Sequence, residues 1–424
     1  MGIVGRHGRA SAVVAALGAL LLLGGAVAPA ATADTMRERQ WYLDRMQAPA
    51  MWKVSTGEGI TVAVLDTGVI PTVPELTGRV LKGKNFMEPK RGADQDTNGH
   101  GTAMAMLIAG NGANDQGVKG LAPDARILPL TVWGTTKEAG FRRVDALVDA
   151  LRYAADSEAR IIDIGVSFHT SVDDDERDSI KQAVDYAIGR GKLLLTDTGD
   201  TGEDGNDVTY PSAIPGVVGV GAVDTTSTVT KFSAYGPQVA LAAPGVDIPI
   251  RCLEGKPGYC RSQGTGQATA LASASAALIW SRHPDWTGNQ VLRILMNTAG
   301  RPTEDTVPSR YLGYGTIRPR LALLEDPGDP GPADVNPLVA AHEATTPSAS
   351  PSAPTPSASP SRRSFPDATP VAVEGADRGH GSTVWIVTGA VAAAVLALGA
   401  VLLVRRRKRP ARITEYGVDY TRER

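Results

Sequence analysis

Residues 62–69 read VAVLDTGV, an apolar run that ends in an aspartate, a threonine and a glycine. With Ile60 before it, this run is typical of a buried strand followed by a turn. Similar apolar runs follow at 161–166, 192–196 and 217–223, and helix-like segments lie between them, for example at 143–155 and 179–189. Strands that alternate with helices predict an α/β fold, with a parallel sheet and helices on both faces.

Functional side chains of such sheets gather at the carboxyl ends of the strands. Asp66 ends the first run, and Asp197 and Asp200 follow the run at 192–196. An aspartate at a strand end is by itself more often a turn residue or a helix cap. These three residues therefore need a partner before they indicate chemistry.

The partner for Asp66 is His100, in the stretch DTNGHGTAMAMLIAG at 96–110. A single histidine in a loop is more often a surface residue. Together, however, an aspartate in DTG and a histidine in GHGT match the orienting acid and general base of a Ser-His-Asp arrangement in the chain order Asp, His, Ser. Here the sequence resembles the subtilisin-like serine proteases, peptidase family S8.

The resemblance continues through further blocks in order, at 120–132, 210–224, 232–248 and 264–299, and covers about residues 40 to 325. The chain is most similar to the mycosins, the membrane-anchored subtilases linked to type VII secretion in actinobacteria. The resemblance implies a subtilisin-like fold and serine-type endopeptidase ancestry.

Two catalytic positions depart from the family pattern. The nucleophile is expected in a GTS motif, and this chain reads Gly264-Thr265-Gly266, so that Gly266 stands at the serine position. Glycine has no side-chain atom for His100 to deprotonate, and no acyl-enzyme forms there. Asp200 stands where the family has an asparagine that donates to the oxyanion, and an ionised carboxylate would repel that charge while a protonated one could donate.

A third departure lies at 161–167, IIDIGVS, where the resemblance makes Gly165, Val166 and Ser167 a wall of the substrate pocket. None of the nearby hydroxyls falls at the nucleophile position, and each is expected to cap or pack instead. They are Ser262, Thr265, Thr269, Ser273 and Ser275. Attack by a water molecule assisted by His100 remains open, as a slow reaction.

Both ends of the chain carry targeting patterns. Residues 1–33 hold two arginines, an apolar run and an Ala-Thr-Ala site, which predict a cleaved signal peptide. Residues 384–404 form an uncharged apolar stretch about long enough to span a bilayer, and the basic segment 405–424 follows. By the positive-inside rule, the basic tail is cytoplasmic and the globular part lies outside the cell membrane.

The remaining boundaries follow from composition. We expect an N-terminal extension at 34–52, a subtilase-like domain at 53–325 and a disordered stalk rich in Pro, Ser and Ala at 326–383. The net charge of the whole chain is −2, and without its basic ends the chain is acidic. That balance argues against a nucleic-acid partner.

Cys252 and Cys260 are the only cysteines, and both are expected on the oxidising side of the membrane, so they predict a local disulfide rather than free thiols. No set of residues has metal-ligand spacing, and we expect no metal and no cofactor. The acidic run 173–176 is the one weak candidate for calcium, although such runs are usually solvated loops.

Three functional hypotheses follow. The first is a pseudoprotease that binds a peptide or protein partner, or supports a type VII secretion complex, without cleaving. The second is an active S8 endopeptidase that uses an unrecognised nucleophile. The third is a purely structural cap on its stalk. Restoring a serine at Gly266 discriminates the first two.

Overall fold

The computed structural model describes residues 35–345, except Thr97 and the segments 135–142, 169–171, 253–256 and 302–306. Apart from Thr345, these residues belong to the first of two units, Met1–Ala344. The predicted signal peptide, the apolar stretch 384–404 and the basic tail 405–424 lie outside the described residues. Within the described part, no helix is both long enough and apolar enough to cross a membrane.

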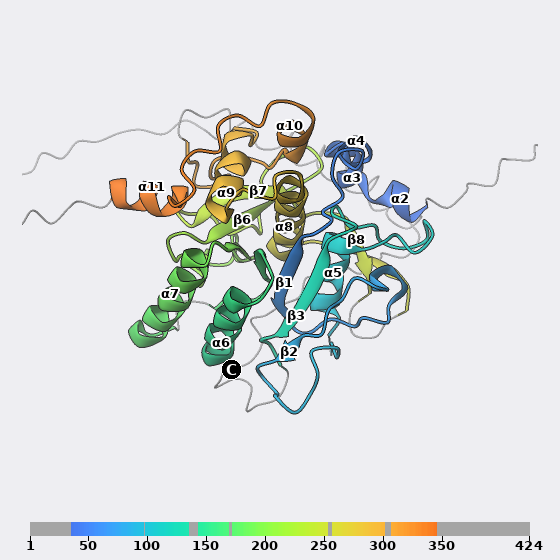
Figure 1. Ribbon diagram of the computed structural model, residues 1–424, viewed down its shortest axis with the longest axis horizontal. Helices are drawn as coiled ribbons and strands as arrows, with labels where there is room; N and C mark the ends of the chain where they lie inside the picture. The colour runs from blue at the N-terminus through green and yellow to red at the C-terminus, as the bar shows by residue number, and fades with distance from the viewer. Residues whose placement is uncertain are drawn as a thin grey trace, which may run out of the picture. The chain divides into compact units, whose positions relative to one another are not determined.

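A parallel sheet forms the centre of the described part (Figure 1). Its seven strands lie in the order β2-β3-β1-β4-β5-β6-β7, and all neighbouring pairs are parallel. The strands are β1 (Thr61–Asp66), β2 (Lys84–Asn85), β3 (Arg126–Thr131), β4 (Ile161–Ile164), β5 (Leu193–Asp197), β6 (Val218–Val223) and β7 (Val239–Pro244). A separate antiparallel hairpin consists of β8 (Ile248–Arg251) and β9 (Tyr259–Ser262).

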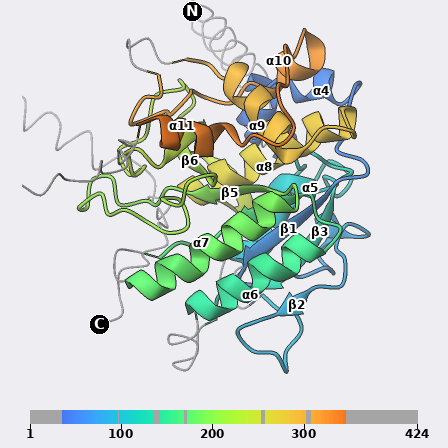
Figure 2. The same ribbon diagram turned by 60° about the vertical axis from the view of Figure 1, so that its left-hand side comes forward.

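Helices cover both faces of this sheet. The long ones are α5 (His100–Ala109), α6 (Arg143–Asp156), α7 (Asp174–Gly189), α8 (Thr265–Arg282) and α9 (Gly288–Asn297). Figures 1 and 2 show α6 and α7 side by side on one face, with α5 and α8 on the other. Shorter elements are α2 (Met36–Arg39), α3 (Trp41–Arg45), α4 (Ala48–Met51), the 3-10 helix η1 (Pro74–Leu76), α10 (Pro319–Leu324) and α11 (Pro337–Thr345).

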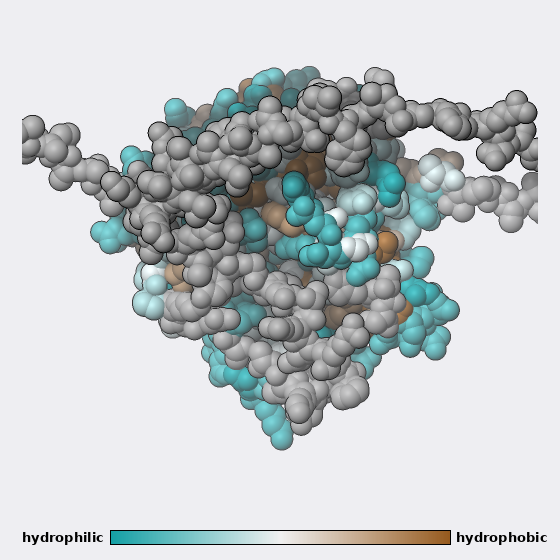
Figure 3. All heavy atoms as spheres, turned by 180° about the vertical axis from the view of Figure 1, so that it is seen from behind, coloured by the Kyte–Doolittle hydropathy of each residue, from teal (hydrophilic) through white to brown (hydrophobic). Residues whose placement is uncertain are grey.

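Side chains of β1 alternate between two apolar clusters because successive residues of a strand point to opposite faces. Val62 and Val64 pack in the cluster that contains α5 and α8, while Ala63 and Leu65 pack in the cluster that contains α6 and α7. Both faces of the strand are therefore buried, as the continuous apolar run predicts. Hydrophilic residues cover most of the described surface seen in Figure 3.

The predicted α/β class and its parallel sheet are confirmed. Four predicted strands correspond to β1, β4, β5 and β6 within two residues. The helix predicted over 179–189 begins earlier, at Asp174, because Asp173 and Glu176 form a capping box at its first turn. The acidic run 173–176 is thus a helix start and not a solvated loop.

The order of the strands also explains where the site lies. From β1 the sheet continues to β3 on one side and to β4 on the other. A ligand site of an open parallel sheet lies at such a reversal, outside the carboxyl ends of the strands. Asp66 is the last residue of β1 and lies at this point.

The N-terminal extension is folded onto the core. Tyr42, Leu43 and Met51 are fully buried in the cluster around α8. The side-chain amide of Gln40 pairs with the backbone of Lys119, donating to its carbonyl at 2.7 Å and accepting from its N–H at 3.0 Å. Segment 34–52 therefore contributes core side chains to the subtilase-like domain.

The stalk differs from the prediction at its start. Residues 326–345 are ordered: Arg293 of α9 donates to the carbonyls of Pro330, Pro332 and Val335, and α11 follows. Backbone carbonyls that accept from a fixed arginine fork hold a proline-rich segment without apolar burial. The rest of the predicted stalk, from residue 346, lies outside the described residues.

Candidate active site

Asp66 and His100 meet at the carboxyl end of β1. The Nδ1 atom of His100 lies 2.9 Å from both carboxylate oxygens of Asp66. Asp66 is fully buried, and His100 is 7% exposed. Because a carboxylate accepts, Nδ1 carries the donated proton, and Nε2 is the ring atom left for another partner.

Asp96 holds this pair in place, a role that sequence reasoning missed. Its Oδ1 accepts from the N–H of Gly99 and the hydroxyl of Thr67, at 2.9 and 2.8 Å. Its Oδ2 accepts from the N–H and hydroxyl of Thr102, at 2.8 and 2.6 Å. Asp96 thereby ties the residue after Asp66 to the first turn of α5. The sequence carried a signal for it, an aspartate four residues before the histidine.

Gly266 is the second residue of α8 and faces the free side of the imidazole. A Cβ atom built on it would lie 3.5 Å from Nε2 of His100 and 3.9 Å from the sulfur of Met104. These are ordinary van der Waals distances, so a Cβ atom at this position would fit without displacing His100 or Met104. No hydroxyl in the described part of the chain is hydrogen-bonded to Nε2 of His100.

The other hydroxyls of this region are engaged elsewhere. Thr269 and Ser275 donate to backbone carbonyls one turn earlier in α8, and Ser262 accepts from Gln267. Thr265 donates to Asp200, and Ser273 donates to Asp163. Each hydroxyl caps or packs, as the sequence analysis predicts.

Asp200 lies at the N-terminus of α8. Its Oδ1 accepts from the N–H of Thr265 at 2.9 Å and from the hydroxyl of the same residue at 2.7 Å. Part of Asp200 faces solvent, but atoms crowded around the carboxyl group desolvate it and raise its pKa, and the two bonds from Thr265 oppose that rise. An acidic group at a helix N-terminus is favourable, because the helix dipole is positive there.

The segment 165–167 follows β4. Gly165 lies so close to Asp66 that a Cβ atom on it would be 2.0 Å from Oδ2 of that carboxylate. Ser167 donates to Oδ1 of Asp197 at 3.0 Å. Val166 is 6% exposed and belongs to the apolar cluster around α6 and α7. Of the three residues predicted to form the pocket wall, it is the one whose side chain lies in the core.

Two further buried carboxyl groups lie near His100: Asp163, which the sequence analysis did not consider, and Asp197, to which it assigned no role. Burial raises the pKa of Asp163 to about 7, against the bond that Ser273 donates at 2.6 Å. Burial, and then the neighbouring Asp200, raise the pKa of Asp197 to about 7. An aspartate inside the apolar run of β4 was the available sequence signal for Asp163.

Asp197 and two other carboxyl groups, those of Asp66 and Asp96, act on the pKa of His100. Burial by itself lowers the pKa of the imidazole, but Asp66, with contributions from Asp96 and Asp197, raises the pKa to about 9. The ring is therefore an imidazolium at neutral pH and forms an ion pair with Asp66.

The predicted disulfide between Cys252 and Cys260 is confirmed, and it joins the residue that follows β8 to the second residue of β9. The hairpin is anchored on the buried Glu75, which accepts from Tyr259 and pairs with Arg251. In the described part of the chain, no group of three or more His, Cys, Asp or Glu side chains is arranged to hold a metal ion.

The subtilase family model, Peptidase S8, matches residues 57–315. The chain belongs to the subtilase family. Among curated subtilases, Subtilisin Savinase from Lederbergia lenta is 32% identical over 262 residues, which are 61% of this chain and 90% of that protein. The major intracellular serine protease of Bacillus subtilis is 34% identical over 243 residues, 56% of this chain and 73% of that protein.

Solved structures of subtilases from type VII secretion are similar throughout the domain. MycP1 from Mycobacterium smegmatis has a TM-score of 0.62 and 27% identity, covering 72% of this chain and 89% of its own. MycP3 from the ESX-3 system has a TM-score of 0.58 and 28% identity, covering 67% of this chain and 87% of its own. The resemblance to mycosins that the sequence predicts is confirmed.

Proposed function

We propose that this subtilase is a membrane-anchored, extracytoplasmic pseudoprotease that binds an extended peptide or protein partner without cleaving it. One observation carries the proposal: Gly266 lies where a nucleophile would face Nε2 of His100, and no described hydroxyl replaces it. Covalent catalysis needs an oxygen at that point. In a subtilisin, loss of the serine lowers kcat by about 10⁶.

Two further features support an inactive site. His100 has a pKa raised to about 9, so at neutral pH the ring already carries the proton that a general base would accept. The carboxyl group of Asp200 occupies the N-terminus of α8, where its negative form opposes a developing oxyanion. Both features weaken attack by a water molecule as well as by a protein nucleophile.

The proposed partner role rests on the solved relatives. One of them, MycP1, is described as an essential component of the type VII (ESX-1) secretion system, with a TM-score of 0.60 and 30% identity over 69% of this chain. We propose that the present chain supports a secretion complex of that kind. Strand pairing with an extended segment is the general way in which such a fold holds a peptide.

The proposed location rests on the ends of the sequence. Residues 1–33 have the pattern of a signal peptide, and residues 384–404 have the length and composition of a membrane span. Arg405–Arg409 then favour a cytoplasmic C-terminus. The folded domain would accordingly face the outside of the cell membrane.

The competing function is an active serine-type endopeptidase, and one observation favours it. The acid and base keep hydrogen-bonding geometry, with Nδ1 of His100 2.9 Å from Asp66. The retained acid and base are useful for hydrolysis only if the chain also has a nucleophile. Their retention therefore favours an undetected nucleophile.

The two functions are separated by labelling the full chain with a fluorophosphonate probe and assaying casein cleavage. We expect neither from the natural chain, and measurable labelling from Gly266→Ser. Gly266→Ala is the matched control, because it adds the same Cβ without an oxygen and should stay unlabelled. Labelling or cleavage by the natural chain would overturn the proposal.

Support of a complex is tested separately. A His100→Ala chain should assemble with its membrane complex, and sustain secretion, as well as the natural chain does. Loss of secretion with intact folding of the variant would mean that the imidazole is used chemically, against the proposed role.

A further inference from the structure

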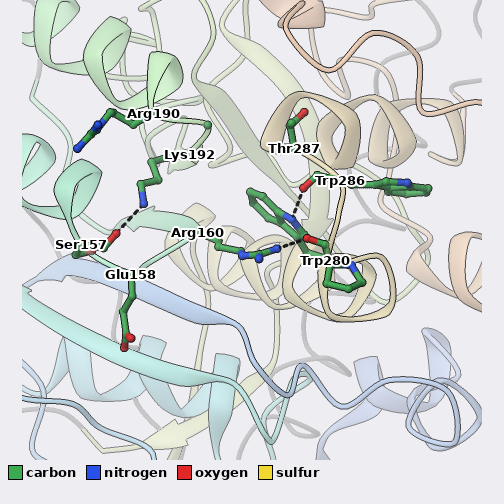
Figure 4. A pocket seen from close by; sticks show the side chains of 10 residues that line it. Ser157, Glu158, Arg160, Arg190, Lys192, Trp280, Trp286 and Thr287 are labelled. Carbon is green, nitrogen blue, oxygen red and sulfur yellow. Dashed lines mark hydrogen bonds between the residues drawn. The ribbon is translucent and has the colours of Figure 1, made fainter.

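A second site lies at the edge of the sheet opposite Asp66. Arg160 and Lys192 directly precede β4 and β5, which run parallel to β1, so both residues lie at the amino ends of the strands. They line a pocket of about 320 Å³, together with Arg190, Trp280 and other residues (Figure 4). The pocket is remote from the candidate active site, and the proposed function does not use it.

The charges of this pocket are unbalanced. Three of its lining residues are cationic and one, Glu158, is acidic, although the whole chain has a net charge of −2. Arg190 is neutralised at the rim by Asp156, at 2.8 Å. Arg160 and Lys192 have no acidic partner within salt-bridge distance among the described residues.

Both unpaired cations are fixed by backbone carbonyls. Arg160 donates to the carbonyl of Pro284 at 2.7 Å, and Lys192 donates to those of Ser157 and Ala159 at 2.8 and 2.6 Å. Figure 4 shows Lys192 reaching Ser157 and Arg160 reaching toward Trp280. A guanidinium has five donors and an ammonium three, so these bonds leave donors on each for a ligand.

The partial burial of Lys192 favours the binding of an anion beside it. Burial of Lys192, and then the nearby Arg190, lower the pKa of its ammonium group, and the more distant charge of Asp156 opposes them only in part. An anion held beside Lys192 and Arg160 would reverse both effects, since opposite charges at short range favour the charged form. Planar carboxylates match the guanidinium fork especially well.

Two tryptophan side chains, Trp280 and Trp286, are among the residues that line the pocket. Trp280 is 3% exposed, and its indole N–H is already used by the carbonyl of Trp286 at 2.7 Å. The guanidinium carbon of Arg160 lies 5.5 Å from the centre of the Trp280 ring. Trp286 stacks on His283, with ring centres 3.9 Å apart. Trp280 is therefore almost closed off from a ligand, and the partly buried Trp286 supplies the aromatic surface of the pocket.

We propose that this pocket binds an aromatic carboxylate, with the carboxylate between Arg160 and Lys192 and the ring against Trp286. The volume is at the lower end of the range for small-ligand sites, which limits the bound part to about the size of one aromatic amino acid. Such a group exists as a free acid or as the C-terminal residue of a peptide, and the two sources present the same chemistry.

The test is a titration of the full chain with N-acetylphenylalanine. Binding is measured by tryptophan fluorescence and by calorimetry. N-acetylphenylalaninamide is the neutral control, and a blocked tetrapeptide that ends in phenylalanine carries the same carboxylate at a chain end. We expect the acid to bind about tenfold or more tightly than the amide, as a charge-assisted contact requires. If the peptide binds more tightly than N-acetylphenylalanine, the natural ligand is a peptide C-terminus. If the two bind equally, the natural ligand is a free acid.

Variants assign the effect to the two unpaired cations. Arg160→Gln and Lys192→Gln should each weaken binding of the acid by about tenfold, while Lys181→Gln, at an exposed ion-paired lysine outside the pocket, should leave it within about twofold. Circular dichroism checks that each variant is folded. Equal binding of acid and amide, absence of binding to either carboxylate, or an effect of Lys181→Gln as large as that of Arg160→Gln would overturn the proposal.

Discussion

A Cβ atom on Gly266 would lie 3.5 Å from Nε2 of His100, with no other atom closer. The site therefore keeps room for the missing side chain. We predict that Gly266→Ser alone gives weak hydrolysis, because Asp200 still occupies the N-terminus of α8. Adding Asp200→Asn should raise kcat by about 10² to 10³, the effect of one oxyanion donor measured in a subtilisin.

A chromogenic peptide substrate and the full chain suffice for this measurement. Asp200→Asn alone is the control and should stay inactive, because it supplies a donor without a nucleophile. If the double variant is no faster than Gly266→Ser, Asp200 is not at the oxyanion position.

Gly165 gives the carboxylate of Asp66 its orientation. A Cβ there would be 2.0 Å from Oδ2 of Asp66, so Gly165→Ala should force the carboxylate to rotate away from His100. We expect the pKa of His100 to fall from about 9, because Asp66 is what raises it against the effect of burial. An NMR titration of the labelled imidazole measures the change.

The control for this prediction is Gly189→Ala at the end of α7, where an added Cβ meets no atom within 4 Å. It should leave the histidine titration unchanged. An unaltered pKa of His100 in the Gly165→Ala chain would show that Asp66 does not need this orientation.

The stability of the folded domain should fall as the pH rises from about 4 to 9. Asp163 and Asp197 have pKa values raised to about 7, so the folded state holds their protons more tightly than the unfolded state, and stability is lost as pH rises from about 4 through 7. His100, raised to about 9, contributes stability below about 6.5 that is lost as pH rises through 9.

Asp163→Asn tests this directly. The amide oxygen can still accept from Ser273, while the titration disappears. The slope of unfolding free energy against pH between 4 and 7 should become shallower by about 1 kcal/mol per pH unit, measured by urea unfolding at several pH values. Asp149→Asn, on the exposed side of α6, should leave the slope as it is. A slope unchanged by Asp163→Asn would contradict the buried titration.

The N-terminal extension should be part of the cooperative fold. Gln40→Ala removes both bonds to the backbone of Lys119 and the bond to the hydroxyl of Tyr42, leaving buried polar groups unpaired. We expect a loss of about 2 kcal/mol or more in unfolding free energy. Arg39→Ala, one residue earlier and exposed, should cost little in the same denaturation experiment.

Much of the fold follows from local patterns. The apolar runs that became β1, β4, β5 and β6 are buried on both faces, and such runs are visible without coordinates. Asp66 and His100 were found because each lies in a distinctive short motif. Asp96 was missed because its four bonds join residues on two different elements, and a sequence does not state which loops meet.

The ordered start of the stalk was missed for a similar reason. Composition describes how little apolar area residues 326–336 can bury, and it contains nothing about Arg293 of α9, whose guanidinium holds three of their carbonyls. Likewise, the resemblance placed Val166 in the pocket wall, while its side chain belongs to the buried apolar cluster that contains residues of α6 and α7.

The sequence alone determined the parallel α/β architecture and the lack of an oxygen at position 266, since glycine has no side-chain atom in any conformation. Only the tertiary structure decided what surrounds that gap: the carboxyl of Asp200 on the first turn of α8, the contact of Gly165 with Asp66, and the buried acids beside His100. These depend on distances between residues far apart in the chain. Distances of that kind, and the desolvation that comes with them, set charge and reactivity, and local residue patterns do not contain them.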